Sequence, residues 1–306
     1  MKGTVADKKL SQLETRFTSY QGVANDQRES GAYKVGKDAI VRWLLQFEDD
    51  RAMEIAFKVL ESMRVVGRPE IILALTLHLQ QKKFKGAKWL CPLGGPQDSS
   101  AVYSYLASDV SAQFDIKTEA LAHALMQDGP ILFFDDFIGS GQQSIDILGA
   151  WLGFEKDPKS DLNEVRLPLP TDELRSRLQE REIGLFFYSG FKKGAERLTE
   201  WAKDKSIKAS VFIGEDEQSL PSIDKVISGQ DLAILKTSCS NIGKRILDDG
   251  TAKHTLAWRE ERCLGYGNKG LLLAFPFNIP TQSLTCLWGE QKSIPWAPLF
   301  RRRKKA

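Results

Sequence analysis

The chain has 306 residues, of which 42% are hydrophobic and 27% charged, so it can bury a large core and is not a disordered polymer. Its formal net charge of +3 depends on one basic run, Arg301–Lys305, without which the balance is slightly acidic. Such a run can contact nucleic acid or an acidic partner, or it can be a solvated tail, and the sequence leaves both readings open.

Composition also sets expectations for the compartment. No apolar run reaches the roughly 18 residues that a membrane helix needs, and Met1–Leu10 lacks the apolar stretch of a secretory signal. The cysteines are scattered without a CxxC pair, which favours reduced thiols over a disulfide framework or a zinc site. They are Cys91, Cys239, Cys263 and Cys286. We therefore expect a cytoplasmic protein without membrane contact.

The first segment, residues 1–84, is predicted to be helical. Residues 1–36 are polar and punctuated by glycine, which indicates a loosely packed arm with one short helix. From Lys37 to Leu79 apolar residues recur at intervals of three and four, which predicts three helices, the last one beginning near Pro69. We expect this unit to form a packing layer.

The second segment, residues 85–230, alternates short apolar runs with amphipathic stretches. Strands are predicted at 88–91, 131–134, 183–188 and 209–213, and helices at 99–106, 121–126, 142–152 and 193–202. The alternation predicts an α/β core with a mostly parallel sheet flanked by helices. Residues 155–182 are charged and proline-rich, and we expect an excursion from the core there.

The third segment, residues 231–306, loses this alternation. Strands are predicted at 232–235, 271–277 and 284–288. Turn residues gather at Gly265–Asn268 and Asn278–Thr281. We expect a small C-terminal cap, or hood, that ends in the basic run.

The end of the predicted strand 131–134 carries the residues with the clearest chemistry. Asp135 and Asp136 follow it, and open parallel sheets bind ligands beyond the carboxyl ends of their strands. Gly139-Ser140-Gly141 then opens a helix, where two glycines let backbone N–H groups approach an anion and the helix N-terminus adds partial positive charge. Further donors follow at Gln142, Gln143 and Ser144. The pattern predicts a phosphate at the loop, and sugar hydroxyls or Mg²⁺ at the carboxylates.

Other phosphate motifs do not fit this segment. A Walker loop is excluded because no lysine follows Gly141, and a dinucleotide fingerprint because Ser144 stands where a third glycine is needed. The remaining alternative is an acidic turn and a helix cap without a ligand. Adjacent aspartates at a buried strand end repel each other unless something binds them, which favours the site.

Residues 131–144 resemble the phosphoribosyl pyrophosphate motif of the type I phosphoribosyltransferases, which has four apolar strand residues, two acidic residues, two apolar residues and a small phosphate loop. The resemblance implies that Asp135 and Asp136 contact the ribose hydroxyls, directly or through Mg²⁺. It also implies that residues 139–143 hold the 5-phosphate. The sequence departs from the family pattern at Gln142 and Gln143, where those enzymes carry small residues or threonine.

The resemblance covers roughly residues 86–214 and implies further roles. Gly94 and Gly95 fall in the loop that holds pyrophosphate in these enzymes. The transition state is oxocarbenium-like and the leaving group is pyrophosphate, which Lys192 or Lys193 would neutralise. The same lysines could instead form a solvated helix start. The implied ligand is phosphoribosyl pyrophosphate or a nucleotide, with Mg²⁺.

A narrower resemblance rests on motifs spread along the chain. They are Trp43–Phe47, Phe137–Gly141, Leu264–Asn268, Asn278–Thr281, Leu287–Trp288 and Trp296–Phe300. Together they resemble the phosphoribosyltransferase-like effectors of bacterial conflict systems, some of which are encoded beside retron reverse transcriptases or other anti-phage modules. This implies a defence effector whose partners include a reverse transcriptase–nucleic acid complex or a DNA-binding protein, with oligomerisation left open.

The hood could recognise an acceptor base, with Tyr266 stacking on it and Asn268 or Asn278 forming a hydrogen bond with it. Such turns can equally be structural, and we expect Trp288 and Trp296 to belong to a core or an interface.

Two functions stay open. One is an enzyme that transfers or cleaves a ribosyl group, which the Asp135-Asp136 pair favours. The other is a catalytically inactive sugar-phosphate sensor or regulatory module of the same fold. Gln142, Gln143 and the absence of an obvious general base favour the second.

Overall fold

In the computed structural model, the chain is described over residues 3–20, 22–23, 32–81, 84, 86–94, 99–154, 169, 171–251, 254–291 and 294–302. It forms two compact units, one of Arg68–Ser219 and one that combines Met1–Gly67 with Leu220–Ala306. The sequence suggested three segments, 1–84, 85–230 and 231–306. The structure instead joins most of the first segment to the third, and groups the helix that begins at Arg68 with the α/β core.

The unit Arg68–Ser219 is built on a five-stranded sheet with the order β5-β4-β6-β7-β8, in which every neighbouring pair is parallel. Its strands are β4 (Trp89–Pro92), β5 (Lys117–Thr118), β6 (Ile131–Ile138), β7 (Ile183–Gly190) and β8 (Ala209–Asp216). The predicted α/β fold with a mostly parallel, helix-flanked sheet is confirmed. The edge strand β5 was not predicted, because two polar residues carry no apolar signal.

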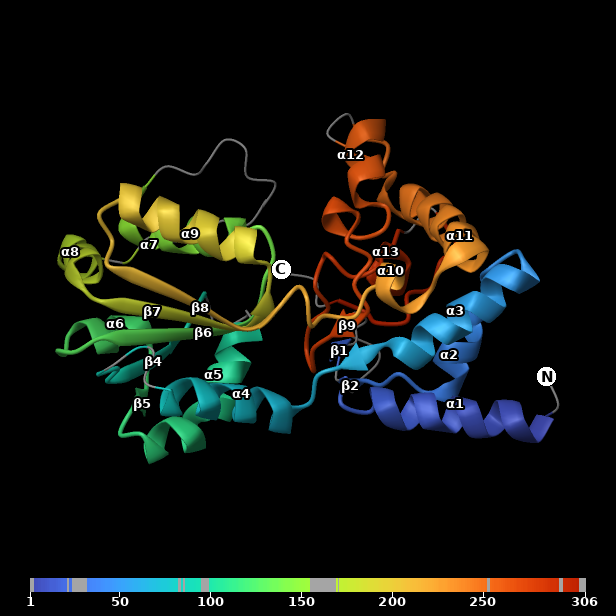
Figure 1. Ribbon diagram of the computed structural model, residues 1–306. Helices are drawn as coiled ribbons and strands as arrows, with labels where there is room; N and C mark the ends of the chain where they lie inside the picture. The colour runs from blue at the N-terminus through green and yellow to red at the C-terminus, as the bar shows by residue number, and fades with distance from the viewer. Residues whose placement is uncertain are drawn as a thin grey trace. The chain divides into compact units, whose positions relative to one another are not determined.

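Helices cover both faces of this sheet (Figure 1). They are α4 (Arg68–Gln80), α5 (Ser99–Gln113), α6 (Leu121–Leu125), α7 (Gln142–Leu152), α8 (Asp172–Glu180) and α9 (Lys192–Asp204). On one face, Tyr103 of α5 packs against Phe134 with ring centroids 6.2 Å apart. On the other, Trp151 of α7 packs against Phe133 at 5.5 Å, in a hydrophobic cluster that includes α6, α8 and α9.

Helix α8 occupies the end of the stretch for which the sequence predicted an excursion. Thr171 caps it, since its hydroxyl accepts a hydrogen bond from the Leu174 backbone N–H at 3.2 Å. Leu174 and Leu178, four residues apart, are both buried in the sheet's cluster. Residues 155–168 and 170 lie outside the described residues.

The strand register brings several loops to one edge of the sheet. Pro92 pairs with Phe134, so Leu93 and Gly94 follow β4 at the level of Asp135 and Asp136. Ile138 pairs with Gly190 of β7, which in turn pairs with Asp216 of β8. The loops after four neighbouring strands therefore meet at this carboxyl edge.

The second unit is mainly helical. Its elements are α1 (Gly3–Phe17), β1 (Gly22–Val23), β2 (Ala32–Tyr33), α2 (Lys37–Leu44), α3 (Asp50–Ser62), β3 (Arg64–Val65), α10 (Ile223–Val226), α11 (Gly229–Leu247), α12 (Leu256–Arg262), a 3₁₀ turn η1 (Tyr266–Asn268), β9 (Leu273–Ala274) and α13 (Thr285–Trp288). Helix α1 has 15 residues and is not the short helix expected.

Two strands predicted in the last segment are wrong, and a third is shorter than expected. Residues 232–235 lie within α11, whose buried positions Leu235, Cys239, Gly243 and Ile246 recur with a helical spacing that a four-residue window cannot reveal. Residues 285–288 form α13, and β9 covers only part of 271–277.

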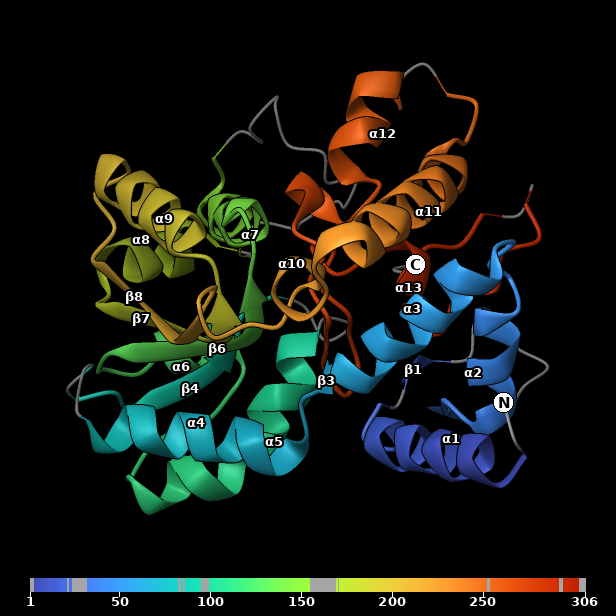
Figure 2. The ribbon, with the colours of Figure 1, turned by 45° about the vertical axis from the view of Figure 1, so that its right-hand side comes forward.

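Distant parts of the sequence share the core of this unit. Strand β3 pairs in parallel with β9, and α3 lies beside α11 (Figure 2). The indole N–H groups of Trp43 and Trp296 both donate to the Cys286 carbonyl, at 2.8 and 3.0 Å. Trp296 packs against this core, as expected, and so does Trp288.

No helix in the described part of the chain is long and apolar enough to cross a membrane.

Candidate functional site at the carboxyl edge of the sheet

The acidic pair lies inside a strand. The sequence predicted that the strand ends at Phe134, but β6 continues to Ile138 and includes Asp135 and Asp136. Both side chains are buried, at 5% and 3% exposure. The Asp135 carboxylate accepts a hydrogen bond from the Asp136 backbone N–H at 2.9 Å. Burial of a carboxylate lowers the stability of the fold unless the group is paired or hydrogen-bonded. The two aspartates are therefore part of the folded interior and are not ordinary surface residues.

The two carboxylates belong to opposite faces of the sheet. Side chains alternate along a strand, so Asp135 follows Phe133 on the face covered by α7, and Asp136 follows Phe134 on the face covered by α5. A ligand that contacts both has to sit at the strand ends, where the faces meet.

The glycine loop closes directly onto helix α7. Gly141 is the residue before the helix, and its φ of 78° is a left-handed conformation that side chains other than glycine disfavour. Ser140 Oγ accepts a weak hydrogen bond from the Gln142 backbone N–H at 3.4 Å. The first N–H groups of α7 thus lie just beyond the acidic strand end, where helix geometry favours an anion.

The loop packs against the first turn of α9. A Cβ added to Gly141 would lie 2.5 Å from the Gly194 carbonyl oxygen, and one added to Gly194 would overlap the Gly139 carbonyl oxygen. The two backbones touch because neither residue has a side chain. This contact fixes the loop relative to β7 and α9. It could not be predicted from the sequence, because Gly194 lies inside an ordinary helical pattern.

The two glutamines that depart from the family pattern behave differently. Gln143 is exposed. The Gln142 amide donates to Asp146 Oδ1 at 2.8 Å, and its Oε1 accepts a hydrogen bond from Arg197 Nη2 of α9. Its side chain is therefore held against the helix surface.

The loop after β4 is described only in part. Gly94 follows buried Leu93 and has a φ of 125°, a backbone conformation suited to glycine. The buried Ser100 hydroxyl donates to the Leu93 carbonyl at 2.8 Å and anchors the start of this loop to α5. Gly95, the other glycine predicted there, lies outside the described residues.

Lys192 is the first residue of α9 and contacts carboxylates from the end of β8. Its Nζ lies 2.8 Å from Asp216 Oδ2, and its backbone N–H donates to Glu217 Oε2 at 3.0 Å. The hydrogen bond with Asp216 raises the pKa of Lys192 and lowers the pKa of Asp216. Lys192, for which the family resemblance implies a contact with pyrophosphate, thus lies at the carboxyl edge of the sheet, with its charge partly neutralised.

Ser189 is a buried polar residue at the start of the segment Ser189–Lys193, where the family resemblance implies a further substrate loop. It pairs with Phe137 in the sheet, is completely buried, and its Oγ has no hydrogen-bond partner among the described residues. By strand alternation it shares the face of Leu185 and Phe187, where α7 and α9 pack. An unsatisfied buried hydroxyl at this edge is a candidate ligand contact.

The donor set at this edge suits Mg²⁺ rather than a transition metal. No group of three or more His, Cys, Asp or Glu side chains in the described residues is arranged to hold a metal ion. Asp135 and Asp136 offer oxygen ligands only. Mg²⁺ commonly uses one or two carboxylates and takes its remaining ligands from water and substrate phosphates, so this pair fits that ion.

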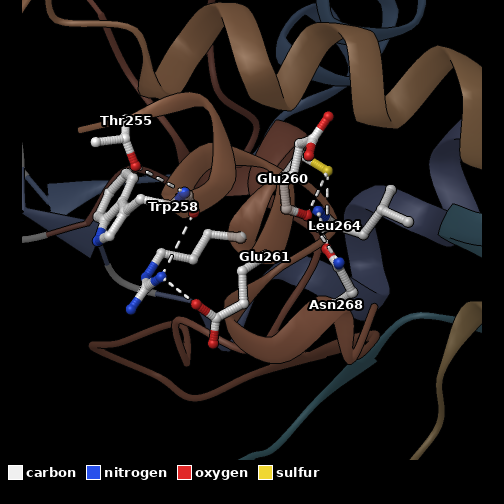
Figure 3. A network of polar contacts seen from close by, with 8 residues as sticks. Thr255, Trp258, Glu260, Glu261, Leu264 and Asn268 are labelled. Carbon is white, nitrogen blue, oxygen red and sulfur yellow. Dashed lines mark hydrogen bonds and ion pairs between the residues drawn. The ribbon is translucent and has the colours of Figure 1, made fainter.

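Tyr266 and Asn268 lie in the other unit. Figure 3 shows Asn268 among the polar contacts of that unit. Asn268 Oδ1 accepts from the Leu264 backbone N–H at 3.2 Å, and its Nδ2 donates to the Glu260 carbonyl at 2.8 Å. The Arg262 guanidinium lies 4.6 Å from the ring centroids of both Trp258 and Tyr266. These contacts give the turn a structural role, and base recognition by either residue stays a prediction.

Cys91 lies in β4 and pairs with Phe133, two residues before Asp135. Burial raises the pKa of its thiol to about 12, which disfavours the reactive thiolate. An open hollow lies at the opposite, amino edge of the sheet, where Arg177 and Arg181 donate to backbone carbonyls of residues 125–129. Its polar groups serve the fold, and it lacks a glycine loop or a buried acid.

Comparison with known proteins identifies the family. A family model described as PRTase-CE matches residues 40–302, which include the whole α/β unit and most of the second unit. A search of curated proteins found no match. The acidic strand end and the glycine loop are the parts expected of a phosphoribosyltransferase-like fold. The chain therefore belongs to the PRTase-CE family and is phosphoribosyltransferase-like.

Proposed function

We propose that the protein binds the ribose 5-phosphate part of phosphoribosyl pyrophosphate, or of a nucleotide, at the carboxyl edge of its sheet. The observation that carries the proposal is the succession of two buried aspartates and a left-handed glycine loop that opens α7. The loop and helix N–H groups suit the phosphate, and the carboxylates suit the ribose hydroxyls.

Mg²⁺ belongs to this proposal. Asp135 or Asp136 would hold it, and when bound it supplies positive charge that neutralises the ligand's phosphates. On the protein side, the carboxylates also orient the ribose and stabilise positive charge that develops at the sugar, while Lys192 faces the pyrophosphate. An anion that enters must compete with Asp216 and Glu217 for Lys192.

The proposed reaction is ribosyl transfer or cleavage of an N-glycosidic bond. A second candidate is a sensor that binds the same ligand without consuming it. The observation that favours the sensor is the acidic partner of Lys192, because a lysine engaged by Asp216 is less available to a leaving group.

Titration calorimetry tests the binding site. We expect wild-type protein to bind phosphoribosyl pyrophosphate in the presence of Mg²⁺, and Asp135→Asn with Asp136→Asn to abolish binding. The matched control is Asp128→Asn with Glu182→Gln, two exposed acids at the opposite edge of the same sheet, which should bind like wild type. Absence of binding to wild type, or equal losses in both double variants, would reject the site.

Following the ligand after binding separates the two functions. Release of pyrophosphate or of a free base over hours identifies an enzyme. Stable binding of intact ligand identifies the sensor.

We propose further that the protein is an effector of a bacterial anti-phage system. The support is the set of motifs that the sequence shares with such effectors. Two of these motifs, Trp43–Phe47 and Trp296–Phe300, pack together in the core of the second unit. A reverse transcriptase–nucleic acid complex or a DNA-binding protein is the proposed partner. In a plaque assay, a locus that protects its host should lose protection with the Asp135/Asp136 double variant; retained protection would count against the role.

A further inference from the structure

The two edges of the five-stranded sheet differ in length and chemistry. One edge is β5, which has only two residues, Lys117 and Thr118. The other edge is β8, whose eight residues begin with the uncharged run Ala209–Gly214. Short strands, lysine and proline at a sheet edge discourage pairing with a strand of another chain. The edge at β5 is short and carries a lysine, whereas the run Ala209–Gly214 contains neither lysine nor proline.

The hydrogen-bonded ladder between β7 and β8 uses the backbone groups of every second residue of β8. The Lys208 carbonyl accepts a hydrogen bond from the Ile183 N–H at 2.9 Å, so the groups of Lys208 point toward β7. Successive residues of a strand direct their N–H and C=O groups to opposite sides. Those of Val211 and Ile213 therefore point away from β7, where no other strand pairs with β8 in the described part of the chain. They can form a second ladder.

Burial is incomplete along β8. Every residue of the neighbouring β7 is buried, whereas no residue of β8 is. Val211 and Ile213 pack partly against the core on the face that α9 covers. On the other face, the ring centroids of Phe212 and His78 lie 4.8 Å apart. Apolar side chains on both faces thus stay partly exposed at this edge, and a further strand would cover them.

A second copy of the chain fits this edge as an antiparallel strand. With a two-fold axis at Phe212, Val211 of each copy lies opposite Ile213 of the other. These are the residues whose N–H and C=O groups point outward, so the two copies can exchange backbone hydrogen bonds at both positions. A two-fold contact uses the same surface on both partners, and this strand is apolar on both sides of its axis.

Charge complementarity selects this register. Lys208 is exposed and has no ion pair in the described part of the structure. In the register above it lies opposite Asp216 of the second copy, at both ends of the strand pair and at positions where facing side chains are closest. Asp216 is partly exposed and has lone pairs beyond those that bond Lys192. An axis one residue away would place Lys208 opposite Gly214 or Gln218, and both charge pairs would be lost.

We propose that the protein forms a two-fold dimer in which β8 of one copy pairs in the antiparallel sense with β8 of the other. The axis lies at Phe212, and the two five-stranded sheets become one continuous sheet. The inference does not depend on the proposed function, because it uses only the sheet edge and its charges. A strand from a different protein could use the same backbone groups, but the paired charges on either side of Phe212 favour a second copy.

Exchanged charges test the register in the full chain. Lys208→Asp places two aspartates opposite each other at both ends of the strand pair, and Asp216→Lys places two lysines there. Each variant alone should self-associate at least roughly 10-fold more weakly than wild type, since like charges directly opposite each other are destabilising. An equimolar mixture of the two variants should recover the dimer, because every charge then faces its opposite. Sedimentation equilibrium measures the association in each sample.

Val211→Pro tests the backbone ladder. Proline removes the outward N–H of this residue and leaves the bonds to β7 in place, which edge strands tolerate. The variant should be monomeric and should still unfold cooperatively. Lys117→Asp, at the other edge of the sheet, is the control and should dimerise like wild type.

Three results would overturn the inference. A wild-type chain that stays monomeric would leave the edge, at most, to a strand of another protein. A wild-type dimer that persists in Val211→Pro and in both charge variants would use a different surface. A mixture of the two charge variants that does not recover the dimer would reject the register with its axis at Phe212.

Discussion

At the scale of single residues, burial and partners decide what each polar group of the site can do. Asp135 and Asp136 are buried within β6, although the sequence predicted that the strand ends at Phe134, and strand alternation directs their side chains to opposite faces of the sheet. The residue types were readable from the sequence, because two acids after an apolar run are unusual. Their position inside a strand was not readable from the sequence. Phe137 and Ile138 could equally anchor a loop to the core, whereas the structure continues the strand through them.

The ion pair of Lys192 and Asp216 gives a prediction about pH. Because the folded-state pKa of Asp216 is lowered, its stabilising effect is present above its ordinary pKa and is lost as pH falls through the lowered value. The pKa of Lys192 is raised, so its effect is present below its ordinary pKa and is lost as pH rises through the raised value. Lys192→Met should therefore return the Asp216 pKa toward its ordinary range.

Carboxyl ¹³C NMR titration of wild type and Lys192→Met measures this shift, with Lys193→Met as the neighbouring control. An Asp216 pKa that is the same in wild type and Lys192→Met would mean that the pair does not form in solution.

At the scale of elements, the loop and α9 act as one packed piece. Gly194 is required because its backbone touches Gly139, and α9 sits over β7 and β8 through Leu198 and Ala202. Long apolar runs predicted β6, β7 and β8, and helical spacing predicted α7 and α9. The short edge strand β5 was not predicted, because it is defined only by its pairing with β4. The helix α11 was not predicted, because the spacing of its buried residues extends over more positions than the four that were interpreted as a strand.

Gly194→Ala should test the packed loop. The added methyl group would overlap the Gly139 carbonyl, and overpacking of this kind costs about 1–3 kcal/mol of unfolding free energy. Glu196→Ala, at an exposed position of the same helix, should be close to neutral. Urea denaturation compares the two, and a Gly194→Ala stability equal to that of the control would show that the loop does not touch α9.

At the scale of the whole molecule, the first and last parts of the sequence form one unit and the middle forms the other. The sequence predicted the α/β middle correctly but could not predict that residues 1–67 share a core with 220–306. Nothing in the spacing of Trp43 or Trp296 reveals that both indoles bond the same carbonyl of Cys286. Long-range pairing of this kind requires the folded chain.

Trp43→Ala should therefore lower the stability of the core that the first and last parts of the sequence share. Removing this buried indole should cost about 3–5 kcal/mol, and Trp43→Phe should cost less because a ring remains in the cavity. Hydrogen exchange should show faster exchange in β3 and in its partner β9 alike. Faster exchange confined to residues 37–65 would contradict a shared core.

The proposed function depends most on whether the carboxyl edge of the sheet binds a sugar phosphate. Titration of phosphoribosyl pyrophosphate with Mg²⁺ into wild type and into the Asp135→Asn, Asp136→Asn protein measures this directly. We expect saturable one-site binding to the wild-type protein. The double variant should lose this binding while its unfolding transition stays cooperative. Binding that survives in the double variant, or a wild-type protein that takes up no ligand, would contradict it.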